Sequence, residues 1–72
     1  MATETAATLG INVREIRLRK GLSQQNLADE CEIARPRISE IESGDFNPTT
    51  ETIEIIATAL GVSVARLFQP QK

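Results

Sequence analysis

Apolar residues recur every three or four positions along this chain and are interrupted at short intervals by glycine or a hydroxyl residue. This spacing fits the 3.6-residue period of an α-helix and not the two-residue period of a strand. Gly21, Gly44 and Gly61 each follow an apolar run, at the position where helices commonly end. A chain of 72 residues divided in this way predicts an all-α domain of short helices.

We place the helix ends with cap residues and glycines. Ser23, Thr49 and Ser63 suit N-caps, because a hydroxyl accepts a hydrogen bond from an amide of the first turn. Pro36 suits a first turn, where its missing N–H costs nothing. We therefore expect five helices, over about 9–20, 23–31, 35–43, 49–61 and 63–68. Residues 1–8 and 69–72 are expected to form flexible tails around one domain, 9–68.

The inner positions of these helices define an expected core. A core of this size contributes only about 3–5 kcal/mol net, so replacing one buried isoleucine with alanine, at about 2–5 kcal/mol, is enough to unfold the domain. The expected core residues are Leu9, Val13, Ile16, Leu22, Leu27, Ala28, Ile33, Ile38, Ile41, Ile53, Ile56, Leu60, Leu67 and Phe68.

The composition excludes several kinds of site. With one cysteine, the chain cannot form an intramolecular disulfide. With no histidine, it has neither an imidazole metal ligand nor a nucleophilic site that depends on histidine. We expect Cys31 to be a small buried hydrophobic residue. No apolar run approaches the roughly 18 residues of a membrane span, and residues 1–10 lack the features of a secretory signal. We therefore expect no enzyme, metal, cofactor, small-molecule ligand or membrane contact.

The second and third expected helices lie three or four residues apart, which is the spacing of a helix-turn-helix. Ala28 lies where the two helices would cross closely, and a larger side chain would separate them. Helix hairpins of this kind also occur in proteins that never bind DNA, so the pattern alone leaves the function open.

Four segments together resemble the Cro/repressor-type (XRE) helix-turn-helix family, which includes lambdoid phage repressors and restriction–modification controller proteins. The resemblance covers about residues 9–68, and it implies a compact five-helix lambda-repressor-like fold, a homodimer and an operator with inverted half-sites. The segments are 16–28 (IRLRKGLSQQNLA), 38–44 (ISEIESG), 47–49 (NPT) and 59–63 (ALGVS).

By this resemblance, base contacts fall on the outward face of the third helix, at Arg35, Pro36, Ser39 and Glu40. Arg35 is the strongest candidate, because its planar fork matches guanine O6 and N7; the alternative is a phosphate clamp. Pro36 offers only an apolar contact with a thymine methyl. Ser39 can donate or accept a hydrogen bond, so it would tolerate different bases. Glu40 either accepts from cytosine, holds Arg35 or Arg37, or is simply solvated.

The resemblance also implies phosphate contacts around this helix. Gln24 begins the second helix, where the family commonly touches a phosphate; its alternative is a solvated polar residue. Arg37 is expected to point sideways, which favours contact with a phosphate over contact with a base. The full set of phosphate candidates is Gln24, Arg37, Ser43, Asn47, Thr49 and Thr50.

The resemblance also implies one structural ion pair, and the sequence departs from the family pattern at three places. Arg17 and Glu42 match positions that typically pair between the first and third helices. Glu32 replaces the usual glycine of the turn, so either the turn has another shape or Glu32 adopts a left-handed conformation at a cost of about 1 kcal/mol or more. Ala34 replaces the usual Ser or Thr cap, and the loop 45–47 has no Lys or Arg.

Four apolar residues near the end of the chain exceed what the expected core accommodates. In relatives the corresponding region often forms the two-fold interface, so they are candidates for a dimer contact; the alternative is that they complete the core. They are Ile55, Val64, Leu67 and Phe68.

The formal charge of −2 does not exclude DNA, because the charges are unevenly distributed. Residues 1–20 carry +2, 21–45 carry −4 and 46–72 are neutral. We expect a dimeric, sequence-specific transcriptional regulator that binds double-stranded DNA in the cytoplasm of a prokaryote or phage-infected host. The alternative is a protein-interaction module such as an antitoxin, which uses the same fold.

Overall fold

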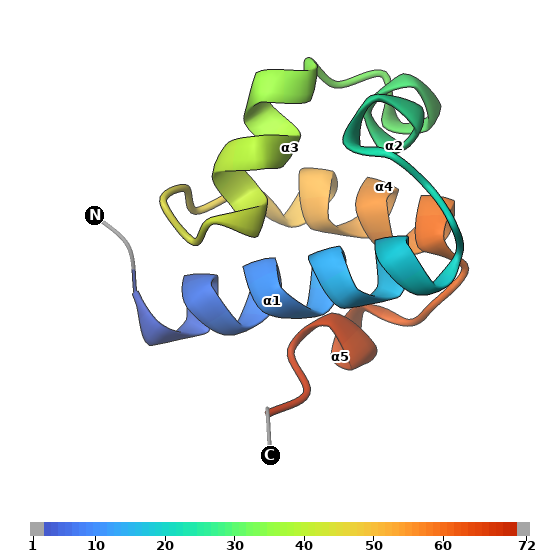
Figure 1. Ribbon diagram of the computed structural model, residues 1–72. Helices are drawn as coiled ribbons and strands as arrows, with labels where there is room; N and C mark the ends of the chain where they lie inside the picture. The colour runs from blue at the N-terminus through green and yellow to red at the C-terminus, as the bar shows by residue number, and fades with distance from the viewer. Residues whose placement is uncertain (1–2, 71–72) are drawn as a thin grey trace.

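Five helices make up the computed structural model, which describes residues 3–70. They are α1 (Glu4–Arg19), α2 (Gln24–Cys31), α3 (Arg35–Glu42), α4 (Thr50–Leu60) and α5 (Val64–Leu67). Figure 1 shows α2 and α3 on one side of α1 and α5 on the other. In this arrangement α1 packs against α3 and α5, while α2 packs against α3 and α4. The expected all-α, five-helix architecture is confirmed.

The first helix begins earlier than the sequence analysis predicted. Thr3 is its N-cap, and its Oγ1 accepts a hydrogen bond from the Ala6 amide at 3.0 Å. Ala6 is buried, so these first turns contribute to the core. The tail predicted over residues 1–8 is therefore wrong from Glu4 onward, while Met1 and Ala2 lie outside the described residues.

The other helix ends agree with the predictions to within one or two residues. The Ser23 hydroxyl accepts from the Asn26 amide at 2.9 Å, and the Asn26 side chain accepts from the Ser23 amide at 3.0 Å. This reciprocal capping box satisfies two amides that a helix start leaves unpaired. Thr49 and Ser63 cap α4 and α5 in the predicted way. Gln69 and Pro70 follow α5 without helical structure, and 71–72 lie outside the described residues.

The core contains most of the expected residues. Leu22, Ile33, Ile53 and Phe68 are only partly buried and pack against its edge. Cys31 is buried, as expected, and burial raises the pKa of its thiol, with a smaller contribution from the charge of Glu30. The buried apolar residues are Ala6, Leu9, Val13, Ile16, Leu27, Ala28, Cys31, Ile38, Ile41, Ile56, Ala57, Leu60 and Leu67.

Two residues of α1 determine how closely its neighbours pack. The sequence analysis assigned a role to neither of them. A Cβ atom at Gly10 would lie 2.6 Å from the carbonyl oxygen of Glu42, so only glycine allows α1 to approach the end of α3. Asn12 is 1% exposed, and its Nδ2 donates to the carbonyl oxygens of Leu67 at 2.8 Å and Gln69 at 2.9 Å. Asn12 therefore fixes the end of α5 to α1, and its amide is satisfied inside the core.

Among residues 3–70, no helix is both long enough and apolar enough to cross a lipid bilayer.

Candidate nucleic-acid interface

Helices α2 and α3 are joined by a short turn that contains Glu32. This residue has φ 56° and ψ 44°, the left-handed conformation, and it is the only non-glycine residue with positive φ among residues 3–70. The turn therefore keeps the shape that glycine favours, and the alternative of a different turn is excluded. For an L-residue this conformation costs about 1–2 kcal/mol.

Helix α3 begins with no side-chain cap. Ala34 occupies the N-cap and makes no side-chain hydrogen bond, which agrees with the sequence analysis. Pro36 lies in the first turn, as predicted. The exposed start of α3 therefore presents backbone amides without the usual hydroxyl beside them.

Arg17 and Glu42 form the expected ion pair. Arg17 Nε lies 2.6 Å from Glu42 Oε2, and Nη2 lies 3.0 Å from Oε1. The two side chains are 8% and 4% exposed. Arg17 Nη1 also donates to the carbonyl oxygen of Leu22 at 2.7 Å, so the pair joins α1, the α1–α2 turn and α3. This bidentate geometry makes the pair strong and directional.

Gln24 connects this ion pair to the start of α3. Its Nε2 donates to Glu42 Oε1 at 3.0 Å, and its Oε1 accepts from Arg35 Nη1 at 3.3 Å. Gln24 is thus held by a buried carboxylate rather than freely solvated. Arg35 is exposed, and no carboxylate pairs with it within residues 3–70, so most of its N–H donors remain available.

Glu40 holds Arg37 and not Arg35. Arg37 Nη1 lies 3.0 Å from Glu40 Oε1, and both side chains are about half exposed. The Arg37 guanidinium carbon lies 3.9 Å from the centre of the Phe46 ring. The α3–α4 loop therefore holds the Arg37 guanidinium over Phe46, a contact that the sequence analysis did not foresee.

A surface hollow of about 340 Å³ brings together residues from α1, α2 and α3. It is lined by Arg14, Gln24, Ser39, Glu42 and Ser43, three of which are predicted DNA contacts. Arg14 was not predicted, although its place three residues before Arg17 puts it near the same side of α1. It supplies an exposed positive charge beside polar groups that suit a phosphate.

Two of the loop candidates already use their hydroxyl groups within the protein. Ser43 Oγ lies 3.0 Å from the Glu40 carbonyl oxygen and 3.1 Å from Asp45 Oδ2, so its proton is used locally. Thr49 Oγ1 caps α4 by accepting from the Thr52 amide at 3.2 Å. Asn47 and Thr50 are exposed.

The folded domain thus carries a helix-turn-helix with an exposed second helix, and its sequence relationships agree. Residues 13–67 match the helix-turn-helix family HTH_3. The chain belongs to this family. As a member of the HTH_3 family it is a DNA-binding transcriptional regulator and not an enzyme.

Several relatives resemble this HTH_3 protein over most of its length. The control protein C.BamHI of Bacillus amyloliquefaciens is 44% identical over 63 residues, 86% of this chain and 78% of that protein. A crystal structure of the hypothetical transcription factor NHTF from Neisseria has a TM-score of 0.89 at 37% identity, covering 93% of this chain and 77% of that chain. In sequence, this chain spans 60% of the length of a hypothetical transcription factor of Neisseria meningitidis.

A third relative has been crystallised with DNA. The restriction–modification controller protein C.Esp1396I, solved as a tetramer in complex with its natural 35 base-pair operator, has a TM-score of 0.83 at 32% identity. The match covers 92% of this chain and 87% of that chain. The folds therefore agree over nearly all of both chains.

The four candidate dimer residues of this HTH_3 protein separate into two groups. Leu67 is fully buried in the core, so its assignment to a dimer interface was wrong and its alternative role holds. Phe68 is half-buried and packs against the core. Ile55 and Val64 remain 39% and 38% exposed. Of the four residues, only Ile55 and Val64 present large exposed apolar side chains.

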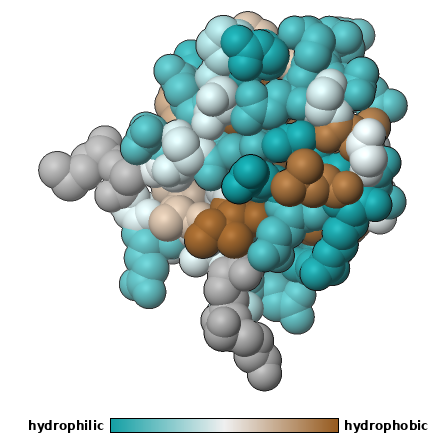
Figure 2. Space-filling model, in the orientation of Figure 1, coloured by the Kyte–Doolittle hydropathy of each residue, from teal (hydrophilic) through white to brown (hydrophobic). Residues whose placement is uncertain are grey.

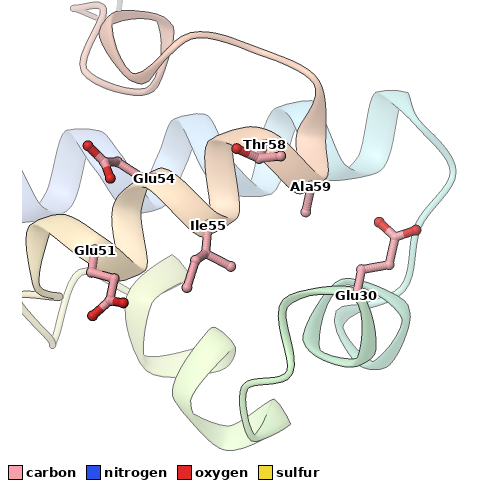
Figure 3. A pocket seen from close by; sticks show the side chains of 6 residues that line it. All are labelled: Glu30, Glu51, Glu54, Ile55, Thr58 and Ala59. Atoms are coloured by element: carbon pink, nitrogen blue, oxygen red, sulfur yellow. The ribbon is translucent and has the colours of Figure 1, made fainter.

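Ile55 lies in a surface groove of about 580 Å³ between α2 and α4. Figure 3 shows its side chain beside Thr58 and Ala59, with the carboxylates of Glu30, Glu51 and Glu54 around it. Two further exposed apolar side chains, Ile11 and Leu18, lie on α1 and were not predicted. Figure 2 shows hydrophobic patches on a face that is otherwise largely hydrophilic.

Proposed function

We propose that this protein regulates transcription by placing α3 in the major groove of a specific operator. One observation carries the proposal: among residues 3–70, the exposed guanidinium of Arg35, at the first position of α3, donates a hydrogen bond only to the neutral Gln24 amide and pairs with no carboxylate. A neutral neighbour leaves the full positive charge and most donors for DNA. A bidentate pair with guanine O6 and N7 discriminates against other bases by about 1–3 kcal/mol.

Contacts with the DNA backbone would fix the position of α3. Gln24 is oriented by Glu42, so its second Nε2 proton has a defined direction toward a phosphate. Asn47 and Thr50 are exposed near the start of α4, where backbone amides and the helix dipole favour an anion. Ser39 offers a hydroxyl beside Arg14 in the hollow. Ser43 and Thr49 would contribute less, because their hydroxyls already serve the loop and the α4 cap.

We further propose that the protein binds as a homodimer to inverted half-sites, with centres about one helical turn apart. Ile55 and Val64 provide exposed apolar surface for the two-fold contact. The assembly of C.Esp1396I as a tetramer on its operator supports self-association on DNA. Because each subunit neutralises few phosphates, tight binding would require both.

The similarity to C.Esp1396I, a restriction–modification controller protein, favours a controller over a phage-type repressor as the genetic role. The site of action would be the prokaryotic cytoplasm, where the DNA lies. Neither assignment changes the predicted contacts.

The test is selection of bound duplexes from a randomised library, followed by mobility-shift titration of the selected operator. Arg35→Ala should abolish preference for the selected sequence and reduce its affinity by about tenfold or more, as expected for loss of a bidentate base contact. Arg19→Ala removes one charge from the end of α1, outside α2 and α3, and is the matched control. Selection that yields no shared sequence would overturn specific binding, and equal effects of the two variants would overturn the role of Arg35.

Interface mutations test the dimer independently. Ile55→Asp should shift the protein to monomer in sedimentation equilibrium, because it places a charge in an apolar contact. Thr5→Asp adds the same charge at an exposed position of α1, outside this groove, and should leave the oligomeric state unchanged. A wild-type protein that stays monomeric both free and on the operator would contradict the proposal.

A further inference from the structure

The α3–α4 loop lies directly after the candidate recognition helix and contains an aromatic residue. Residues 45–47 contain an acid, an aromatic residue and an amide, with no basic side chain. The aromatic residue, Phe46, is half-buried and packs against the core, so its ring is held in place. Above that ring lies the guanidinium of Arg37, 3.9 Å from the ring centre. The loop therefore holds an arginine that belongs to α3.

We propose that Phe46 is a positioning residue for DNA binding, which fixes Arg37 for contact with a phosphate where the loop itself supplies no cation. This inference rests on the proposed function. It extends it by assigning a role to a residue that was not among the predicted DNA contacts.

The geometry leaves Arg37 able to bind. A guanidinium stacked on a ring uses its flat face, while its N–H donors lie in the plane and point outward. One of its five donors, on Nη1, is directed at Glu40 Oε1 at 3.0 Å. The other four remain for a phosphate oxygen. The Arg37 side chain is 45% exposed, so these donors are accessible.

The ring also holds Arg37 without cancelling its charge. Glu40 alone would be a poor support, because an exposed pair three residues apart is weak, and its negative charge opposes an approaching phosphate. An aromatic ring attracts a cation through its quadrupole and carries no net charge. Phe46 therefore restricts the many rotamers of Arg37 while leaving a positive group facing the DNA. Fixing the side chain before binding reduces the entropy lost on binding.

A phosphate contact carries no sequence information, and this determines how the inference is tested. Two probes are used: the selected operator and a mixed-sequence duplex of about 30 base pairs, which is long enough for two half-sites. Both are titrated with the wild-type protein, Phe46→Leu, Phe46→Tyr, Arg37→Ala and the double variant Phe46→Leu/Arg37→Ala. Leucine keeps apolar packing without a ring, and tyrosine keeps the ring.

Phe46→Leu should weaken binding to both duplexes by about two- to fivefold, the fold-change that corresponds to one exposed cation–π contact. Phe46→Tyr should bind like the wild type. Arg37→Ala should weaken binding to both probes and reduce the magnitude of the log–log salt slope by about 0.9 per subunit. In the Arg37→Ala background, Phe46→Leu should cause no further loss, because the residue that it positions is absent.

Thermal melts separate this role from a purely structural one. If Phe46→Leu lowers the melting temperature, Phe46→Met is titrated as a second variant without a ring. Equal losses from Phe46→Leu in the wild-type and Arg37→Ala backgrounds would overturn the inference, as would unchanged binding of Phe46→Leu. A wild-type protein that retards neither duplex refutes the proposed function and with it this inference. A wild-type protein that binds both, with an unaffected Phe46→Leu, refutes the inference alone.

Discussion

Replacement of Glu42 by leucine should strongly destabilise the protein, because Glu42 pairs with the buried Arg17. The substitution removes the carboxylate that accepts two hydrogen bonds from Arg17, at 2.6 and 3.0 Å. Arg17 would keep only its bond to the Leu22 carbonyl oxygen. Because the Arg17 side chain is 8% exposed, water cannot readily replace the lost partner. The folded state would then contain a buried charge without compensation.

Removing one partner of a buried ion pair costs about 3–5 kcal/mol. Urea unfolding measures this loss, since the free energy of unfolding of a small protein falls by roughly 1 kcal/mol per molar urea. The midpoint of Glu42→Leu should therefore fall by about 3 M or more, or the variant should be unfolded in water. The exposed pair of Arg37 and Glu40 is an internal control. Glu40→Leu should cost about 0–1 kcal/mol, because an exposed pair contributes little.

A double variant distinguishes the charge from the shape of the site. Arg17→Met combined with Glu42→Leu removes both charges and keeps apolar volume, so most of the stability should return. Equal midpoints for Glu42→Leu and Glu40→Leu would refute the argument from burial. A double variant as unstable as Glu42→Leu would show that packing, not the unpaired guanidinium, causes the loss.

Three further predictions follow from the backbone and the charges. Glu32→Gly should raise the free energy of unfolding by about 1 kcal/mol, because glycine adopts the left-handed conformation without strain; an unchanged urea midpoint would contradict this. Gly10→Ala should destabilise the protein by about 1–3 kcal/mol in the same assay, although alanine favours helices, because its Cβ meets backbone atoms of α3; a stabilised variant would disprove the close contact. The log–log salt slope of operator binding should be about −5 for the dimer, from about three phosphate contacts per subunit, and a slope near zero in the titration would exclude such contacts.

The helix ends were predictable because their causes are local. Ser23, Thr49 and Ser63 cap the helices that follow them through bonds to amides three residues ahead. Such contacts depend on sequence neighbours, and the pattern contains them. The early start of α1 has the same kind of cause in Thr3, but without an apolar periodic run to mark it, the signal was indistinguishable from a tail.

The roles of Gly10 and Asn12 could not be predicted from their neighbours in the sequence. In sequence, Gly10 lowers helix propensity and Asn12 interrupts an apolar stripe. Each becomes favourable only where another segment approaches: the end of α3 at Gly10, and the carbonyl oxygens at the end of α5 at Asn12. The partner of Asn12 at Leu67 is 55 residues away. A polar residue in an otherwise buried stripe does indicate that a distant partner exists, but not which one it is.

The candidate interface shows the same difference between features that the sequence predicts and contacts between distant segments. The candidate DNA contacts on α3 were predicted from the resemblance to a family, whereas the side chains that support them were not predicted. Gln24 is anchored through the buried Glu42, and Arg37 through a loop aromatic that has no counterpart in the quoted motif. Since a side chain that is already oriented loses less entropy on binding, we expect these supports to affect DNA affinity as the proposed contacts do. Two regulators with the same residues on the recognition helix should therefore differ in affinity when their loops differ. In this protein, a substitution at Phe46 should therefore reveal as much about DNA affinity as a substitution on α3.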